Sequence, residues 1–109
     1  MSLKEEMDSK ISQITSKWKN TKKKQMFGGF GYYLNGNMIA GIHSKNYVLR
    51  LGEEEAKIAT KLPIFKNFIV SGKIRKGWVI AKPDALSDDK IFLKWLNKAR
   101  EFVDTLPPR

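Results

Sequence analysis

The dipeptide Asn35-Gly36 constrains the fold of this chain more than any other feature of the sequence. It follows an aromatic segment in which apolar residues recur with the two-residue period of a strand. Asn and Gly both tolerate the positive φ that a two-residue hairpin turn requires. The dipeptide therefore predicts one strand over residues 26–34 and a second over Asn37–His43. A polar turn at residues 44–46 leads to a third strand, 47–51. Because these connections are short, the three strands form an antiparallel meander.

Three segments have the apolar spacing of amphipathic helices. One stripe predicts a first helix that ends at residues 19–21, and it consists of Leu3, Met7, Ile11, Ile14 and Trp18. Gly52 followed by three glutamates begins a short second helix, which Pro63 ends. Ser87 caps a third helix, whose stripe is Phe92, Trp95, Leu96, Ala99, Phe102, Val103 and Leu106.

Residues 65–71 and 77–82 predict a second hairpin, with its turn at Gly72 and a basic turn segment over 73–76. The economical packing is a two-layer α+β sandwich, in which helices cover one side of a five-stranded, mainly antiparallel sheet. The expected order is α-β-β-β-α-β-β-α. Since 109 residues are too few for two separate cores, residues 1–109 form a single domain.

The residue chemistry points away from catalysis, and we expect no enzyme, no metal and no cofactor. The chain has no cysteine and one histidine, which excludes thiol nucleophiles and most protein-built transition-metal sites. His43 and Ser44 are adjacent, so on a strand they point to opposite faces. The segment Gly28-Gly29-Phe30-Gly31 does not match a dinucleotide-binding loop, because a strand follows it instead of a helix. Most acidic residues cluster at predicted helix starts, where the helix dipole favours them.

The net charge of +10 comes from 21 basic and 11 acidic residues, and the stretches 9–52 and 56–83 contain no acid. If the two basic runs meet at one sheet edge, they form a patch that attracts phosphates. The patch would consist of Lys17, Lys19, Lys22, Lys23, Lys24, Lys73, Arg75 and Lys76. The favoured alternative is that lysines guard strand edges and keep the protein soluble, because lysine outnumbers arginine. A base-stacking platform of Phe30, Tyr32, Tyr33 and Tyr47 is disfavoured, since strand alternation buries about half of these rings.

An ordered set of residues between about 24 and 109 resembles the N-terminal domain of the TfoX (Sxy) family. The set is Met26, Phe27, Gly28, Gly29, Phe30, Gly31, Asn35, Gly36, Asn37, Met38, Gly41, Arg50, Gly72, Gly77, Trp78, Val79, Leu106, Pro107, Pro108 and Arg109. The resemblance implies a two-layer α+β fold, no catalytic residues, and architectural roles for the glycines and Trp78. Full-length members regulate natural competence for DNA uptake together with a transcription activator. They also carry a helical C-terminal domain, which we do not expect here.

We therefore expect a stand-alone, non-enzymatic regulatory or interaction module that engages an unidentified protein partner through its sheet face, its edge or a groove beside Gly28-Gly29. The alternative is a nucleic-acid-binding protein that uses the lysine-rich segments. A homodimer stays open, because an exposed sheet edge has to be covered. The N-terminus has no apolar signal segment and no run is long enough to span a bilayer, so we expect a cytoplasmic protein with no membrane partner.

Overall fold

The Asn35-Gly36 turn forms as the sequence predicts, with φ of 52° at Asn35 and 81° at Gly36. It joins the second and third of six strands in a computed structural model that describes residues 2–26 and 29–109. Within those residues the elements are α1 (Leu3–Thr15), β1 (Thr21–Met26), β2 (Gly29–Leu34), β3 (Asn37–His43), β4 (Asn46–Arg50), α2 (Glu53–Ala59), β5 (Lys66–Val70), β6 (Lys73–Ala81), the 3-10 turn η1 (Pro83–Leu86) and α3 (Asp89–Asp104).

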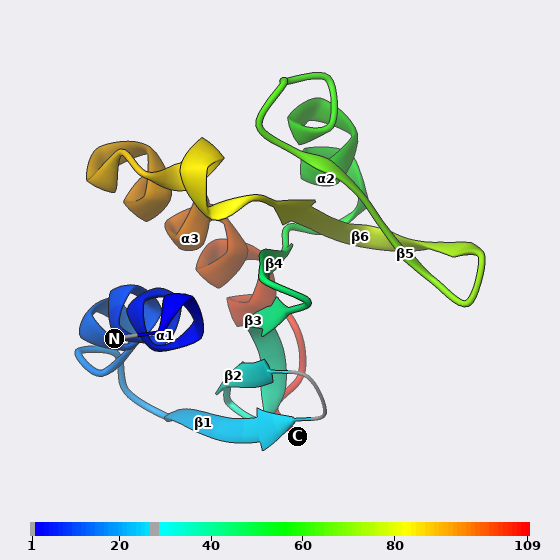
Figure 1. The fold of residues 1–109 in the computed structure, drawn as a ribbon. Coiled ribbons are helices and arrows are strands. Elements are labelled where there is room, and N and C mark those ends of the chain that lie inside the picture. Colours follow the sequence, from blue (N-terminus) through cyan, green and yellow to red (C-terminus); the bar gives the residue numbers. More distant parts are fainter. Residues whose placement is uncertain (1, 27–28) are drawn as a thin grey trace.

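The described strands form one antiparallel sheet in the order β1-β2-β3-β4-β6-β5 (Figure 1). The predicted fold class is therefore confirmed, but the sheet has six strands where the sequence predicts five. The additional strand is β1, which pairs along its whole length with β2, from Thr21 opposite Leu34 to Met26 opposite Gly29. Its lysines lack the apolar alternation that marks a strand, and they suit an edge position. The strand β6 is also longer than predicted, since residues 73–76 extend it and the turn is confined to Ser71 and Gly72.

Three helix ends differ from the predictions. The helix α2 ends at Ala59, and Pro63 lies in the turn that follows it. The helix α1 ends at Thr15, so Trp18 lies in the following turn and packs against the core from there. The Thr21 hydroxyl stabilises this turn by donating hydrogen bonds to the carbonyls of Thr15 and Trp18. The cap of α3 is Asp88 and not Ser87, because the Asp88 carboxylate accepts hydrogen bonds from the amides of residues 90 and 91.

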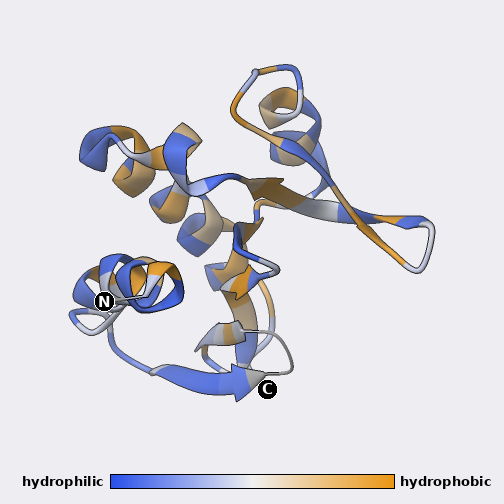
Figure 2. Ribbon diagram, in the orientation of Figure 1, coloured by the Kyte–Doolittle hydropathy of each residue, from blue (hydrophilic) through white to orange (hydrophobic). Residues whose placement is uncertain are grey.

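The core lies between the sheet and the helices α1 and α3, which cover one face of it (Figures 1 and 2). Directly opposed residues Tyr32, Ala40, Leu49 and Val79 carry this apolar face across four strands. The helices contribute buried side chains that include Met7, Ile11, Phe92, Leu96 and Val103. The helix α2 packs against β6 and joins the same core through Ala56 and Ala59. No helix in the described part of the chain is long and apolar enough to cross a membrane.

Candidate functional site

A bend at Gly77 sends the β5–β6 hairpin out of the plane of the sheet. The strand β6 pairs with β4 only from Trp78 to Ala81. At Gly77 φ is 86°, and its carbonyl accepts hydrogen bonds from the amides of Leu51 (2.8 Å) and Gly52 (3.0 Å). Figure 1 shows the hairpin beyond this bend extending from the sheet on the side opposite α1 and α3. The bend therefore places the hairpin beside the sheet face that these helices leave open.

A groove of about 330 Å³ lies between this open face and the hairpin. It is lined by Phe30, Met38, Gly41, Ile42, His43, Val48, Phe68, Val70, Arg75 and Trp78. Gly41 lies opposite Gly31 in the β2–β3 ladder, so neither strand presents a side chain at that point of the open face. On the hairpin, the Phe68 ring contacts the His43 ring of β3 edge-on, with 5.7 Å between their centroids, and its centroid lies 6.5 Å from that of the tilted Trp78 ring. The groove therefore has an apolar floor and an aromatic wall.

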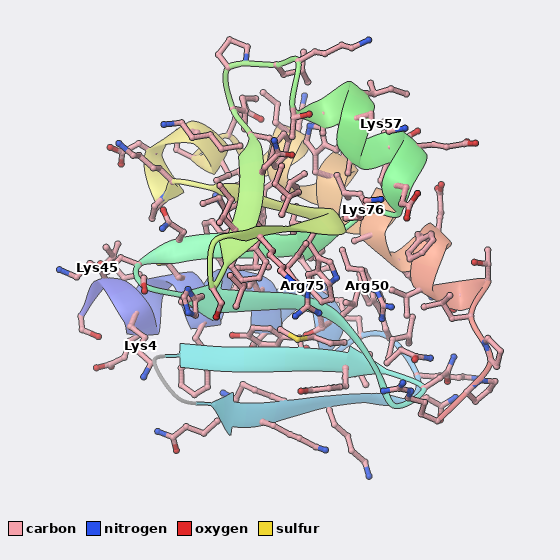
Figure 3. The ribbon with its side chains drawn as sticks, turned by 90° about the vertical axis from the view of Figure 1, so that its right-hand side faces the viewer. Lys4, Lys45, Arg50, Lys57, Arg75 and Lys76 are labelled. Carbon is pink, nitrogen blue, oxygen red and sulfur yellow. The ribbon has the colours of Figure 1, made fainter. Side chains whose placement is uncertain are left out.

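The side chain of Arg50 lies between two aromatic rings near this groove. Its Cζ is 5.3 Å from the ring centroid of Trp78 and 5.9 Å from that of Phe102, and Nη1 donates a hydrogen bond of 3.5 Å to the Met38 carbonyl. Burial lowers the pKa of Arg50, and the charges of Arg109 and Arg75 lower it further. Figure 3 shows Arg50 and Arg75 close to each other on the open side of the sheet. None of the ion pairs within residues 2–26 and 29–109 includes either of these two arginines.

The C-terminal segment reaches this region because it docks on the β2–β3 turn. The Arg109 amide donates to the Asn35 carbonyl (2.8 Å), and the Asn37 side-chain amide donates to the Pro107 carbonyl (2.9 Å). A Cβ at Gly36 would lie 2.4 Å from the Arg109 carbonyl oxygen, so only glycine allows this approach. Two pieces of the family-like motif that are far apart in the sequence therefore meet here and hold Arg109 in place.

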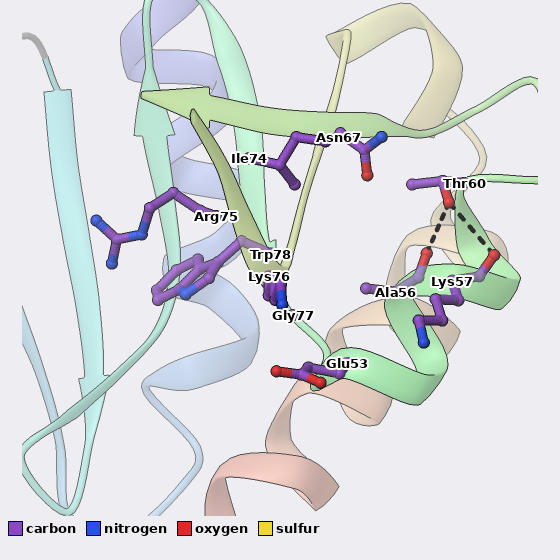
Figure 4. A pocket seen from close by; sticks show the side chains of 10 residues that line it. All are labelled: Glu53, Ala56, Lys57, Thr60, Asn67, Ile74, Arg75, Lys76, Gly77 and Trp78. Carbon is purple, nitrogen blue, oxygen red and sulfur yellow. Dashed lines mark hydrogen bonds between the residues drawn. The ribbon is translucent and has the colours of Figure 1, made fainter. Parts of the chain in front are cut away.

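A second, smaller cavity of about 200 Å³ separates the hairpin from α2 (Figure 4). In Figure 4 Ile74 and Asn67 face α2 across this cavity, whereas Arg75 points away from it. The Thr60 hydroxyl at its rim already donates to the carbonyls of Ala56 (3.0 Å) and Lys57 (3.3 Å). Because this hydroxyl is engaged within its own helix, the polar side chains left at this cavity are those of Glu53, Lys57, Asn67 and Lys76.

Large apolar side chains are exposed around the same hairpin. Ile69 is 58% exposed, Ile74 is 55% exposed and Val70 is 38% exposed. Ile58 on α2 and Leu62 just beyond it are also exposed. Exposed apolar side chains that cluster in this way mark interaction surfaces more often than isolated ones do. Val70 lines the groove, whereas Ile74 and its opposed partner Ile69 lie on the other face of the hairpin, toward α2, so both faces of the hairpin expose apolar side chains.

The basic residues of the expected nucleic-acid patch do not meet at one edge. Lys22, Lys23 and Lys24 are on the edge strand β1, while Lys73, Arg75 and Lys76 are on β6, and three strands separate β1 from β6. Lys23 is paired with Asp8 at 3.0 Å. Lys24 lies over the Tyr33 ring at 4.9 Å. Lys17 and Lys19 are exposed in the turn that precedes β1. Arg75 lines the groove, and both Arg75 and Lys76 line the cavity beside α2.

The other candidate residues also separate by face. Tyr32 and Tyr47 are buried on the helix side, so the aromatic platform does not form as a set. His43 is exposed and contacts Phe68, while Ser44 lies in the turn that follows at a φ of 46°. Of the family-like motif, Phe27 and Gly28 lie outside the described residues. Gly29 is a position of close backbone approach, since a Cβ there would overlap the Ile42 carbonyl.

Sequence reasoning missed Phe68, Val70 and Val48 as lining residues of a binding groove. Alternation along β5 places Phe68 and Val70 on one face of the hairpin, but only the bend at Gly77 decides that this face meets the open sheet. Among the described residues, no group of three or more His, Asp or Glu side chains is placed to hold a metal ion.

Comparison with known proteins identifies one family. The family model described as the TfoX N-terminal domain matches residues 13–103, a range that includes all six strands, Arg50, Arg75 and Trp78. No curated protein and no solved structure matches the chain.

Proposed function

The chain belongs to the TfoX N-terminal domain family, and we propose that it is a non-enzymatic interaction module related to regulators of DNA-uptake competence and transcription. The module engages a protein partner through the groove between the open sheet face and the β5–β6 hairpin. The observation that carries this proposal is the combination of an exposed apolar hairpin with a groove that contains Trp78, Met38 and Arg75. Aromatic residues, methionine and arginine are the types enriched in protein interfaces.

Charge indicates what kind of partner fits this surface. Residues 56–83, which include the whole hairpin, contain no acidic residue. Two copies of the chain that met through their hairpins would bring like charges together, whereas an acidic partner would be attracted and oriented. We therefore propose a different protein with an acidic binding segment as the partner, and a second copy of this chain is an alternative outcome of the test.

Photo-crosslinking in the native host tests this proposal. A benzoylphenylalanine in place of Val70, at the groove, is expected to crosslink to one specific heterologous protein. The same amino acid in place of Leu93, which is 42% exposed on α3, is the matched control and is expected to give no such product. Combining the Val70 replacement with Arg75→Glu should reduce the product strongly, because the substitution reverses a charge beside the groove. A product that is the chain's own dimer, or one common to both positions, contradicts the proposal.

A second candidate function, nucleic-acid binding, is favoured by one observation. Lys22 and Lys24, together with Tyr33 and Arg109, line an open hollow of about 600 Å³ beside β1. Cations beside an aromatic ring are a common arrangement in single-strand binders. The basic residues on β6 lie beyond this hollow, three strands away.

Fluorescence anisotropy with single-stranded and with double-stranded DNA at about 50 and 200 mM salt distinguishes the two functions. The informative variant is Lys22→Glu with Lys24→Glu, which leaves the Lys23–Asp8 ion pair intact. We expect weak binding that differs little between the variant and the wild type, because the basic residues are divided between two ends of the sheet. A wild-type affinity that falls roughly a thousandfold over this range, and is lost in the variant, would establish nucleic-acid binding instead.

A further inference from the structure

We infer that Arg50 and Arg75 form a carboxylate-binding subsite beside the groove, which recognises an Asp or Glu side chain within a short apolar segment of the partner protein. The inference rests on the proposed function and specifies the chemistry of its ligand. Three features of the structure support it: the fixed position of Arg50, the convergence of like charges, and the apolar groove beside them.

Arg50 is held in place before any ligand binds. Its guanidinium lies between Trp78 and Phe102, and a hydrogen bond to the Met38 carbonyl orients it. A guanidinium has five N–H donors, and this bond is the one that Arg50 makes within the described residues. The remaining donors have the planar, forked geometry that matches a carboxylate. Because the side chain is already ordered, binding costs less conformational entropy.

Positive charges converge on this point from three parts of the chain. Arg50 is on β4, Arg75 is on β6, and Arg109 is brought close by the docking of residues 107–109 on the β2–β3 turn. Arg109 and Arg75 are close enough to act on Arg50 electrostatically. An anion bound between Arg50 and Arg75 would relieve this repulsion, since no carboxylate pairs with either arginine in the described part of the chain.

The surroundings favour a peptide carboxylate over nucleic-acid phosphates. Met38, Val48, Phe68 and Val70 line the adjoining groove, whose volume of about 330 Å³ suits one or two apolar side chains. A nucleic acid gains affinity from a track of phosphate contacts, whereas Arg75 is the one Lys or Arg among the described residues that line the adjoining groove. An apolar residue in the groove with an acidic neighbour on the two arginines uses both features together.

Nuclear magnetic resonance titration of the full chain tests the subsite with defined probes. The first probe is an acetylated and amidated pentapeptide of leucines with one central glutamate, and the second has glutamine in place of that glutamate. The indole N–H of Trp78 and the Nε–H of Arg50 report on binding. We expect the glutamate peptide to shift both signals and to bind roughly tenfold or more tightly than the glutamine peptide, since hydrogen bonds to charged groups contribute about 1.5–3 kcal/mol.

Variants separate the carboxylate contact from general charge attraction. Arg75→Gln should lower the affinity for the glutamate peptide roughly tenfold and leave the affinity for the glutamine peptide unchanged, because the substitution removes only the charged contact. Lys61→Gln removes one positive charge from an exposed position outside the groove and should change neither affinity. Arg50→Lys keeps the positive charge but loses the forked pair of N–H donors. It should lower the affinity for the glutamate peptide and leave that for the glutamine peptide unchanged. Circular dichroism confirms that each variant is folded.

Several outcomes would overturn the subsite. Equal weakening of both peptides by Arg75→Gln would show that the contact is not with the carboxylate. If inorganic phosphate shifts the same signals at a lower concentration than the glutamate peptide does, the two arginines bind phosphate and not a carboxylate. If neither peptide binds while the Val70 position still crosslinks a heterologous protein, the carboxylate subsite fails and the proposed function stands. If the glutamate peptide binds selectively but no partner is crosslinked, the subsite stands and the proposed function fails.

Discussion

Gly52→Ala is expected to lower the free energy of unfolding by about 2–6 kcal/mol, the largest effect that we predict for a single substitution. Gly52 has a φ of 87° and a ψ of 159°, a backbone region that is essentially restricted to glycine and that costs a residue with a Cβ about 1–3 kcal/mol. A Cβ at this position would also lie 2.6 Å from the Phe102 ring, and overpacking of this kind typically adds about 1–3 kcal/mol. Urea denaturation followed by tryptophan fluorescence measures the change.

Gly72→Ala is the matched control for this prediction. Gly72 has a similar φ of 77°, but a Cβ there would meet nothing within 4 Å. Gly72→Ala therefore tests a positive φ, at a cost of about 1–2 kcal/mol, without the steric cost. Equal destabilisation by the two substitutions would show that the approach of Phe102 to Gly52 contributes nothing. Because Gly52 also donates to the Gly77 carbonyl, we expect Gly52→Ala to shift the Trp78 indole signal in the groove as well.

Asp8→Ala has the second largest expected effect and should lower the free energy of unfolding by about 1–3 kcal/mol. The Asp8 carboxylate accepts hydrogen bonds from the Tyr32 hydroxyl, from Lys23 (3.0 Å) and from Ser12 (3.0 Å). Tyr32 is only 2% exposed, so removal of the carboxylate leaves a buried hydroxyl without its acceptor. Lys23→Ala is the control, because it removes the partly exposed ion pair and leaves the Tyr32 hydrogen bond in place. We expect Lys23→Ala to lower the free energy of unfolding by less than about 1 kcal/mol.

The same carboxylate predicts a dependence of stability on pH. Burial alone would raise the pKa of Asp8, but the hydrogen bonds from Tyr32, Lys23 and Ser12 and the charge of Lys23 outweigh it and lower the pKa. A lowered pKa in the folded state means that the stabilisation is present above the unfolded value of about 3.9 and is lost as the pH falls through the folded value. The difference in unfolding free energy between wild type and Asp8→Asn should therefore be largest at neutral pH and shrink below about pH 4. A difference that grows on acidification would contradict this assignment.

The two ends of the sheet differ in a way that bears on the proposed function. The edge strand β1 carries Lys22, Lys23 and Lys24, as natural sheets do where they prevent association. The opposite edge strand, β5, exposes Ile69 and Val70. The alternative interpretation of lysines as edge guards therefore agrees with the position of β1, while the apolar hairpin is the less protected end. A partner is expected at the hairpin for this reason.

Features of the fold that depend on neighbouring residues could be predicted from the amino-acid sequence alone. Asn35-Gly36 specified a hairpin because few other dipeptides adopt positive φ at both positions, and the stripe from Phe92 to Val103 specified α3 because its spacing leaves one apolar face. The strand β1 could not be predicted from its own residues, because its run of lysines has no alternation of apolar and polar side chains. It is a strand because it pairs with β2. The helix α1 ended earlier than its apolar spacing indicated, because Trp18 reaches the core from a turn.

The candidate site, in contrast, depends on how distant parts of the chain pack together. The order of the strands placed the two basic segments at opposite ends of the sheet, which no local pattern records. The backbone bend at Gly77 turned Phe68 and Val70 toward the open face, and the docking of residues 107–109 on the Asn35-Gly36 turn brought Arg109 near Arg50. These arrangements arise from contacts between residues far apart in the chain. Their geometry depends on how strands pair and bend in three dimensions, and the spacing of residue types along one dimension does not contain that information.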